Sequence, residues 1–152
     1  MRTIHTDEII RNVKEMCIEA NLHLSEDMEQ AIRNAKKKET GTLGKQILGQ
    51  LCENMDIAAS EQIPICQDTG MAVLFVKVGQ DVHIEGMNIT DAINEGVRQG
   101  YKEGYLRKSV VADPLLRENT KDNTPAIIHY DIVPGDQLEL SLIHISEPTR
   151  PL

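Results

Sequence analysis

Four consecutive residues near the middle of the chain could do chemistry together. The segment 63–70 reads Ile-Pro-Ile-Cys-Gln-Asp-Thr-Gly, and it places a thiol (Cys66), an amide (Gln67), a carboxylate (Asp68) and a hydroxyl (Thr69) in succession. The segment lies between a predicted helix and a predicted strand, and loops carried on a rigid scaffold are common places for binding and catalysis. A cysteine in such a loop could act as a metal ligand or as a nucleophile, because the thiolate serves in both roles.

Cys66 by itself does not establish a site. Cysteine is among the most buried residue types, so a packing residue beside a turn is the simplest interpretation of this cysteine taken alone. A nucleophilic cysteine would need a base, and His83 and His129 are candidates, although nothing in the sequence brings either of them close. Metal ligand, nucleophile and packing residue all stay open at this point.

Composition argues against two classes of partner. The 152 residues contain 16 Lys and Arg against 24 Asp and Glu, which gives a net charge of −8. Nucleic acids and anionic membranes attract basic surfaces, so neither is an expected partner. A hydrophobic content of 40% with 26% charged residues is normal for a folded globular chain. No apolar stretch approaches the roughly 20 residues that cross a bilayer.

Cysteine usage indicates a reducing compartment. The three cysteines, Cys17, Cys52 and Cys66, are widely spaced and include no Cys-x-x-Cys pair. An odd number of distant cysteines does not make a disulfide framework. The first sixteen residues carry charges throughout and lack the apolar core of a signal peptide, so we expect a cytoplasmic protein. Cys17 and Cys52 fall on the apolar faces of predicted helices, which favours packing roles.

The hydrophobic pattern predicts an α+β fold. The first sixty residues indicate three helices, in which Thr6 and Ser25 cap the first two and an apolar stripe from Leu43 to Ala58 marks the third. The predicted elements that follow are a buried strand over 71–78, a shorter strand over 81–85, a helix from about 90 to 107, a strand over 126–133, a Pro-Gly turn at 134–135 and a returning strand from 137. The fold class is therefore a helical N-terminal segment followed by strands with a crossing helix.

Three glycines recur at every fourth position of the fourth predicted helix. Gly96, Gly100 and Gly104 share one side of that helix. A glycine in a helix interior costs about 1 kcal/mol relative to alanine. We therefore expect another segment to approach this side of the helix closely.

Several motifs resemble successive segments of one enzyme family. Pro64-Ile-Cys-Gln-Asp-Thr-Gly70 resembles the first cluster-ligand motif of the iron–sulfur hydro-lyases, the class I fumarase and tartrate dehydratase α-type family. Four further segments resemble that family in the same order, namely residues 94–109, 113–114, 119–125 and 132–136. The resemblance covers residues 1–139. Lys121 departs from it, because glycine is expected there.

The resemblance implies a role for each residue of the Cys66 loop. In this family three cysteine thiolates hold a [4Fe–4S] cluster, so Cys66 would be one ligand. Gln67 would hydrogen-bond a substrate carboxylate, and Asp68 would bind substrate and transfer a proton. Arg107 would clamp a carboxylate bidentately, whereas on position alone it could be a helix C-terminal cation. The two remaining cluster ligands are expected in segments C-terminal to this sequence, so Cys17 and Cys52 are not assigned to the cluster.

The implied function is that of a hydro-lyase α-subunit. The resemblance makes residues 1–139 the N-terminal part of an α-type catalytic domain, here truncated, that hydrates fumarate to malate or dehydrates L-tartrate. Expected partners are a small dicarboxylate substrate and a β-subunit or fused β-domain, assembled as a homo-oligomer of αβ units. The full-length parent would be the enzyme and this fragment alone inactive. An inactive fragment that acts only as an association module is an alternative, and a cysteine-nucleophile enzyme is another.

The last residues interrupt the family pattern. Residues 140–150 read Leu-Ser-Leu-Ile-His-Ile-Ser-Glu-Pro-Thr-Arg, which resembles the translation of a sequencing adapter. The interpretation is that residues 140–152 are a non-native tail and that His144 has no functional role. A native strand is the alternative, because the apolar residues alternate.

Overall fold

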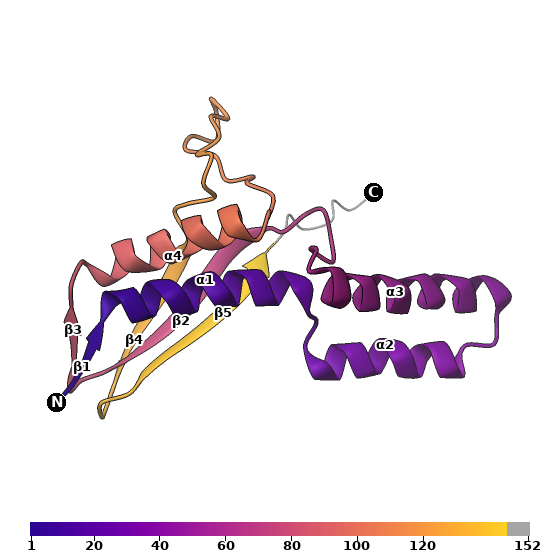
Figure 1. Ribbon diagram of the computed structural model, residues 1–152, viewed down its shortest axis with the longest axis horizontal. Coiled ribbons are helices and arrows are strands. Elements are labelled where there is room, and N and C mark those ends of the chain that lie inside the picture. Colours follow the sequence, from indigo (N-terminus) through magenta and orange to yellow (C-terminus); the bar gives the residue numbers. More distant parts are fainter. Residues whose placement is uncertain (146–152) are drawn as a thin grey trace.

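The computed structural model describes residues 1–145, which form an α+β arrangement (Figure 1). This confirms the predicted fold class. The elements in chain order are β1 (Arg2–His5), α1 (Thr6–Leu22), α2 (Glu26–Lys38), α3 (Thr42–Glu61), β2 (Met71–Gly79), β3 (Val82–Glu85), α4 (Ile89–Glu103), β4 (Ile127–Val133) and β5 (Leu138–Ile145).

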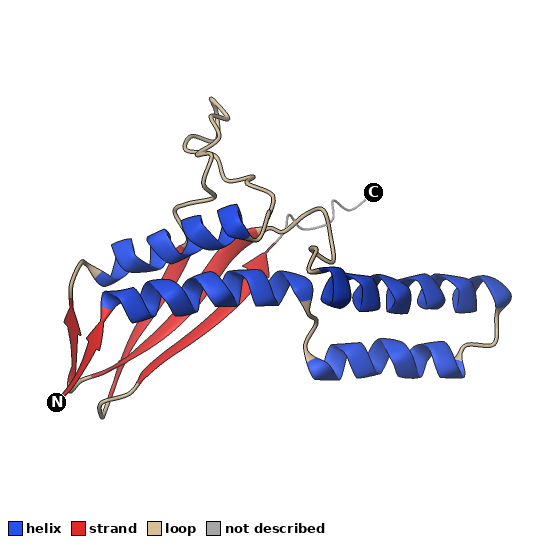
Figure 2. Cartoon of the chain, viewed as in Figure 1, coloured by secondary structure: helices blue, strands red, loops and turns tan. Residues whose placement is uncertain are grey.

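A three-stranded sheet of order β4-β2-β5 forms the centre of the fold, with helices α1 and α4 side by side across one of its faces (Figure 2). Strand β2 runs parallel to β4 and antiparallel to β5. Alternate residues of β2, among them Leu74 and Val76, are buried against the helices together with Ile9 and Ile93. The helices therefore supply the second layer that encloses the core.

Helices α1 and α4 pack closely because α4 presents glycines to α1. A Cβ atom on Gly96 would lie 2.7 Å from the Cβ of Val13, and one on Gly100 would lie 2.7 Å from the Cβ of Cys17. Gly104 would meet Ile18 at 2.9 Å. The close approach expected from the glycine spacing is confirmed, and the approaching segment is α1.

Helices α2 and α3 form a hairpin that extends away from the sheet (Figure 1). Helix α2 buries none of its residues, whereas α3 buries Cys52, Met55 and Ala58. The predicted stripe of α3 is therefore only partly buried, since Leu43 and Ile47 are exposed. The packing role predicted for Cys52 is confirmed.

Several element ends differ from the sequence prediction. The N-cap of α1 is His5, whose Nδ1 accepts a hydrogen bond from the Asp7 amide. Thr6 is instead buried, and its hydroxyl accepts from the Met87 amide at 3.2 Å. Helix α4 ends at Glu103, not near Arg107. Strand β1, which pairs parallel to β3, was not predicted.

Strand β5 includes residues of the segment that resembles an adapter. Leu138 through Ile145 pair antiparallel with β2, which agrees with the native-strand alternative for that part. The rest of the predicted tail, residues 146–152, lies outside the described residues. Within residues 1–145, no helix has both the length and the apolar character that crossing a membrane requires.

Candidate active site

The Cys66 loop is anchored to two helices immediately before the cysteine. Helix α3 ends at Glu61, and its C-cap residue Gln62 adopts a left-handed conformation with φ of 55°. The amide of Ile65 then donates to the Asn21 carbonyl of α1 at 2.9 Å, and the Asn54 side chain of α3 donates to the Ile65 carbonyl at 2.9 Å. Cys66 therefore begins a loop whose entry is held on both sides.

The loop presents its reactive side chains to solvent. Cys66, Gln67 and Asp68 are all exposed, so the packing interpretation of Cys66 is wrong. The amide of Asp68 points at the Cys66 sulfur at 3.5 Å, and the Gly70 amide donates to Asp68 Oδ1 at 3.3 Å.

Thr69 joins this loop to Arg107. The Thr69 hydroxyl accepts a hydrogen bond from the Arg107 amide at 2.9 Å and donates to the Arg107 carbonyl at 3.1 Å. Thr69 is 3% exposed, so both bonds are shielded from water. The structure thus brings Arg107 to the loop that carries Cys66, Gln67 and Asp68.

The chain leaves α4 in a way that delivers Arg107 to Thr69. Tyr105 adopts a left-handed conformation with φ of 54°, and the Leu106 amide returns to the Tyr101 carbonyl at 3.1 Å. Leu106 is buried, whereas the next side chain, that of Arg107, is exposed. Because α4 already ends at Glu103, Arg107 does not serve as a cation in its last turn.

Two buried side chains hold the end of the Cys66 loop. The Tyr101 hydroxyl donates to the carbonyls of Thr69 and Gly70 at 3.2 and 3.0 Å. Burial raises the pKa of Tyr101, which keeps its hydroxyl protonated as a donor. The side-chain amide of Asn123 also donates to the Gly70 carbonyl, at 3.1 Å. Sequence analysis named the Thr69 hydroxyl without giving it a role and gave Tyr101 and Asn123 no functional role, although the family-like motifs at 94–109 and 119–125 contain Tyr101 and Asn123.

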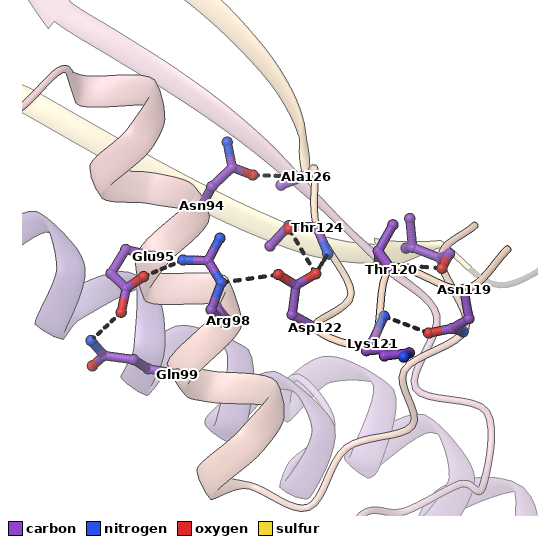
Figure 3. Close-up of polar contacts among 11 residues, drawn as sticks. Asn94, Glu95, Arg98, Gln99, Asn119, Thr120, Lys121, Asp122, Thr124 and Ala126 are labelled. Atoms are coloured by element: carbon purple, nitrogen blue, oxygen red, sulfur yellow. Dashed lines mark hydrogen bonds and ion pairs between the residues drawn. The ribbon is translucent and has the colours of Figure 1, made fainter. Parts of the chain in front are cut away.

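The loop between α4 and β4 is tied back to α4 by polar contacts (Figure 3). Arg98 Nε donates to Asp122 at 3.0 Å, and a terminal nitrogen of the same guanidinium pairs with Glu95. The Asn94 side chain accepts from the Ala126 amide at 2.9 Å. Partial burial raises the pKa of Asp122, but hydrogen bonds from Thr124 and Arg98 outweigh that effect and lower it to about 2. Asp122 is therefore ionised at neutral pH.

The two other cysteines and the two candidate base histidines, His83 and His129, do not join this loop. Cys17 and Cys52 are buried, and desolvation raises the pKa of Cys17 to about 12, so that thiol stays protonated. His129 stacks on Phe75 with 5.1 Å between ring centroids, and His83 lies in β3. Within residues 1–145, no group of three or more His, Cys, Asp or Glu side chains could hold a metal ion. The described residues therefore do not provide a complete ligand set for a cluster.

Comparisons with known proteins place the chain among hydratases and dehydratases, which are lyases. It is 42% identical over 112 residues to a Methanocaldococcus jannaschii protein with the provisional name L(+)-tartrate dehydratase subunit alpha, covering 73% of this chain and 39% of the relative. It is 39% identical over 101 residues to an Escherichia coli fumarate hydratase class I, aerobic, covering 65% of this chain and 18% of the relative.

A third relative extends the match along the chain. The L(+)-tartrate dehydratase subunit alpha of Escherichia coli is 29% identical over 139 residues, covering 89% of this chain and 44% of the relative. The chain therefore spans less than half the length of each of these three relatives. A family model described as fumarate hydratase (Fumerase) matches residues 10–146, and the chain belongs to that family.

The family match also bears on the end of the chain. It extends through residue 146 and thus includes the first residues of the segment that resembles an adapter. The comparisons lend no support to an adapter origin, which stays a prediction.

Proposed function

We propose that this chain forms part of the α-subunit of a [4Fe–4S]-dependent hydro-lyase that adds water to fumarate to give malate. The observation that carries the proposal is the pair of hydrogen bonds between the Thr69 hydroxyl and the Arg107 backbone. These bonds join a loop bearing a thiol and a carboxylate to a segment bearing a guanidinium. That combination suits a small dicarboxylate bound beside a metal centre.

Cys66 is the residue that would hold the cluster. Its thiol is exposed and receives an N–H from Asp68 at 3.5 Å, and hydrogen bonds to sulfur are one of the ways in which proteins tune iron–sulfur centres. The bound cluster would supply a Lewis acid for the hydroxyl or water oxygen. The other cysteine ligands are expected from outside residues 1–145.

Three side chains would handle the substrate. Arg107 would clamp one carboxylate, because a guanidinium offers two parallel N–H donors. Gln67 would hydrogen-bond a carboxylate oxygen, and Asp68 would transfer the proton. In hydration, the water oxygen bonds to one alkene carbon, one of its protons is released, and the other alkene carbon gains a proton. Asp68 is two residues from the proposed ligand, which suits that transfer.

L-tartrate is the second candidate substrate. Two of the relatives carry L(+)-tartrate dehydratase alpha-subunit names, and the M. jannaschii relative is 42% identical over the matched residues. Dehydration of tartrate removes water, whereas hydration of fumarate adds it. Tartrate is a dicarboxylate with a hydroxyl next to a carboxylate, so the same residues would bind it and transfer the proton. A β-subunit or fused β-domain is the proposed partner, since an alpha subunit implies a second chain or domain.

The division of the chain follows from the same proposal. Residues 1–139 would contribute every site residue named here, and residues 140–152 would contribute none. The gene sequence read past codon 139 from an independent template tests this division. If residues 140–152 derive from an adapter, the gene should depart from this sequence at codon 140, and a gene that encodes the same residues 140–152 would contradict the adapter origin.

Variants of the assembled enzyme test the proposed function. Cys66→Ser should abolish both the visible absorption of the cluster after anaerobic reconstitution and the hydration of fumarate, whereas Cys52→Ser should retain both. Arg107→Lys should lower kcat/KM about tenfold through a higher KM, because a lysine cannot make the bidentate contact. Retained activity in Cys66→Ser would remove that residue from the mechanism, and assays with L-tartrate would decide between the substrates.

A further inference from the structure

Asn123 is a fully buried polar residue to which the proposed chemistry gives no role. It is 0% exposed, and its side chain makes three hydrogen bonds. Oδ1 accepts from the amides of Ser109 and Val110 at 2.8 and 3.0 Å, while Nδ2 donates to the Gly70 carbonyl at 3.1 Å. One side chain therefore joins segments that lie 14 and 53 residues away along the chain.

The two ends of this side chain reach the two halves of the candidate site. Gly70 follows Asp68 by two residues, and Ser109 follows Arg107 by two residues. Thr69 and Arg107, which lie next to Gly70 and two residues before Ser109, are joined directly by hydrogen bonds. Asn123 thus spans the same junction as Thr69, from the buried side.

The backbone of Asn123 adopts a conformation that few types of residue tolerate. Its φ is 63°, in the left-handed region that asparagine tolerates better than most residues other than glycine. A residue kept in this region is held there by its surroundings. Here those surroundings are the three hydrogen bonds, which only a side chain with both an acceptor and a donor can make.

The Gly70 carbonyl has a second donor that provides an internal comparison. The Tyr101 hydroxyl donates to the same oxygen at 3.0 Å. Tyr101→Phe therefore removes the hydrogen bonds to the Thr69 and Gly70 carbonyls, both in the Cys66 loop, and leaves the Ser109 and Val110 amides hydrogen-bonded to Asn123. Asn123→Ala removes the bonds on both sides.

We propose that Asn123 is a positioning residue that sets the spacing between Asp68 and Arg107. The inference rests on the proposed function, because it takes proton transfer by Asp68 and carboxylate binding by Arg107 from there. Loss of the hydrogen bonds to the Gly70 carbonyl would misplace Asp68 and lower kcat. Loss of the hydrogen bonds from the Ser109 and Val110 amides would misplace Arg107 and raise KM as well.

Hydrogen exchange on the chain tests the contacts without cluster or turnover. In Asn123→Ala, the Ser109 and Val110 amides should exchange about tenfold faster than in the wild type, because each loses the Asn123 oxygen that accepts its hydrogen bond. In Tyr101→Phe the same amides should exchange at the wild-type rate. Asn12→Ala is a matched control, since the Asn12 side chain bonds within α1 to the Glu8 carbonyl. Unchanged exchange in Asn123→Ala, corrected for global stability, would overturn the inference.

Kinetics of the assembled holoenzyme test the positioning role. Tyr101→Phe should lower kcat about tenfold with KM within about twofold of wild type, and Asn123→Ala should lower kcat and raise KM together. Equal effects of the two variants on kcat and KM, or an Asn123→Ala enzyme with wild-type constants, would overturn the role. If the wild-type enzyme does not hydrate fumarate and does not dehydrate tartrate, the proposed function is overturned, whatever the result of the exchange experiment.

Discussion

Thr69 and Arg107 are joined by two hydrogen bonds, because the Thr69 hydroxyl accepts from the Arg107 amide at 2.9 Å and donates to the Arg107 carbonyl at 3.1 Å. Thr69→Val keeps the side-chain shape and removes both bonds. The variant should be less stable by about 1–3 kcal/mol, since a shielded N–H and C=O lose their partner. Urea unfolding measures this as a lower midpoint with an unchanged m-value.

Thr69→Ser is the matched control for that variant. Serine keeps the hydroxyl and loses one methyl group, so its loss of stability should be the smaller of the two. If Thr69→Val matches the wild type in its urea midpoint, the two bonds do not contribute to stability and the junction is held by other contacts.

The contact between α1 and α4 leads to a second prediction. A Cβ added at Gly100 would lie 2.7 Å from Cys17 Cβ and 3.0 Å from the Lys14 carbonyl oxygen. Gly100→Ala should therefore destabilise the fold by about 1–3 kcal/mol, because backbone atoms cannot move aside without separating the helices. Thermal and urea unfolding would both detect this change.

Gly49 supplies the opposite case for the same substitution. It lies in α3, where an added Cβ has its nearest neighbours, the Lys36 side-chain atoms, at 3.9 Å. Gly49→Ala should raise stability by up to about 1 kcal/mol, because alanine is the better helix former. Equal effects at Gly49 and Gly100 would mean that helix propensity, and not close packing, governs both positions.

Local patterns predicted much of this fold, and contacts between distant segments account for what they missed. The strand expected over 71–78 is β2 (Met71–Gly79), and the helix expected from about 90 is α4 (Ile89–Glu103). Both carry strong periodicity. Strand β1 (Arg2–His5) has only four residues and pairs with β3, some eighty residues away, so no local pattern marks it.

The sequence likewise predicts part of the candidate site, and contacts between distant segments supply the rest. The types and order of Cys66, Gln67 and Asp68 are visible in the sequence, and so is the departure at Lys121. The structure supplies a reason for expecting glycine there, since Lys121 has a φ of 67°. The role of Asn123 depends on partners 14 and 53 residues away, which spacing alone does not reveal.

The hydrogen bonds that Asp122 accepts from Thr124 and Arg98 predict a dependence of stability on pH. The pKa of Asp122 is lowered from 3.8 to about 2 in the folded chain, so ionisation of Asp122 favours folding above about pH 4. That contribution should decline as the pH falls below 3.8 toward 2, because the unfolded chain then binds the proton first. Asp122→Asn should cost about 1 kcal/mol at pH 7, after allowance for solvent screening.

The test compares unfolding free energies of the wild type and Asp122→Asn at pH 7 and pH 3. The difference between the two proteins should shrink at the lower pH. Asp81→Asn removes the same charge from an exposed turn and should show a smaller difference at pH 7. A difference for Asp122→Asn that stays constant with pH would mean that the carboxylate charge is not the source of the stabilisation.

The three cysteines should differ sharply in reactivity. Cys66 is exposed with an N–H directed at its sulfur, whereas Cys17 and Cys52 are buried. Burial raises the pKa of Cys17 to about 12, which suppresses the thiolate that a thiol reagent needs. A colorimetric thiol reagent should therefore modify one cysteine quickly in the native chain and all three in denaturant. Cys66→Ser should eliminate the fast phase, and Cys52→Ser should leave it intact. A fast phase that survives in Cys66→Ser would show that the exposed loop does not carry the reactive thiol, and it would remove the chemical basis for assigning a cluster ligand there.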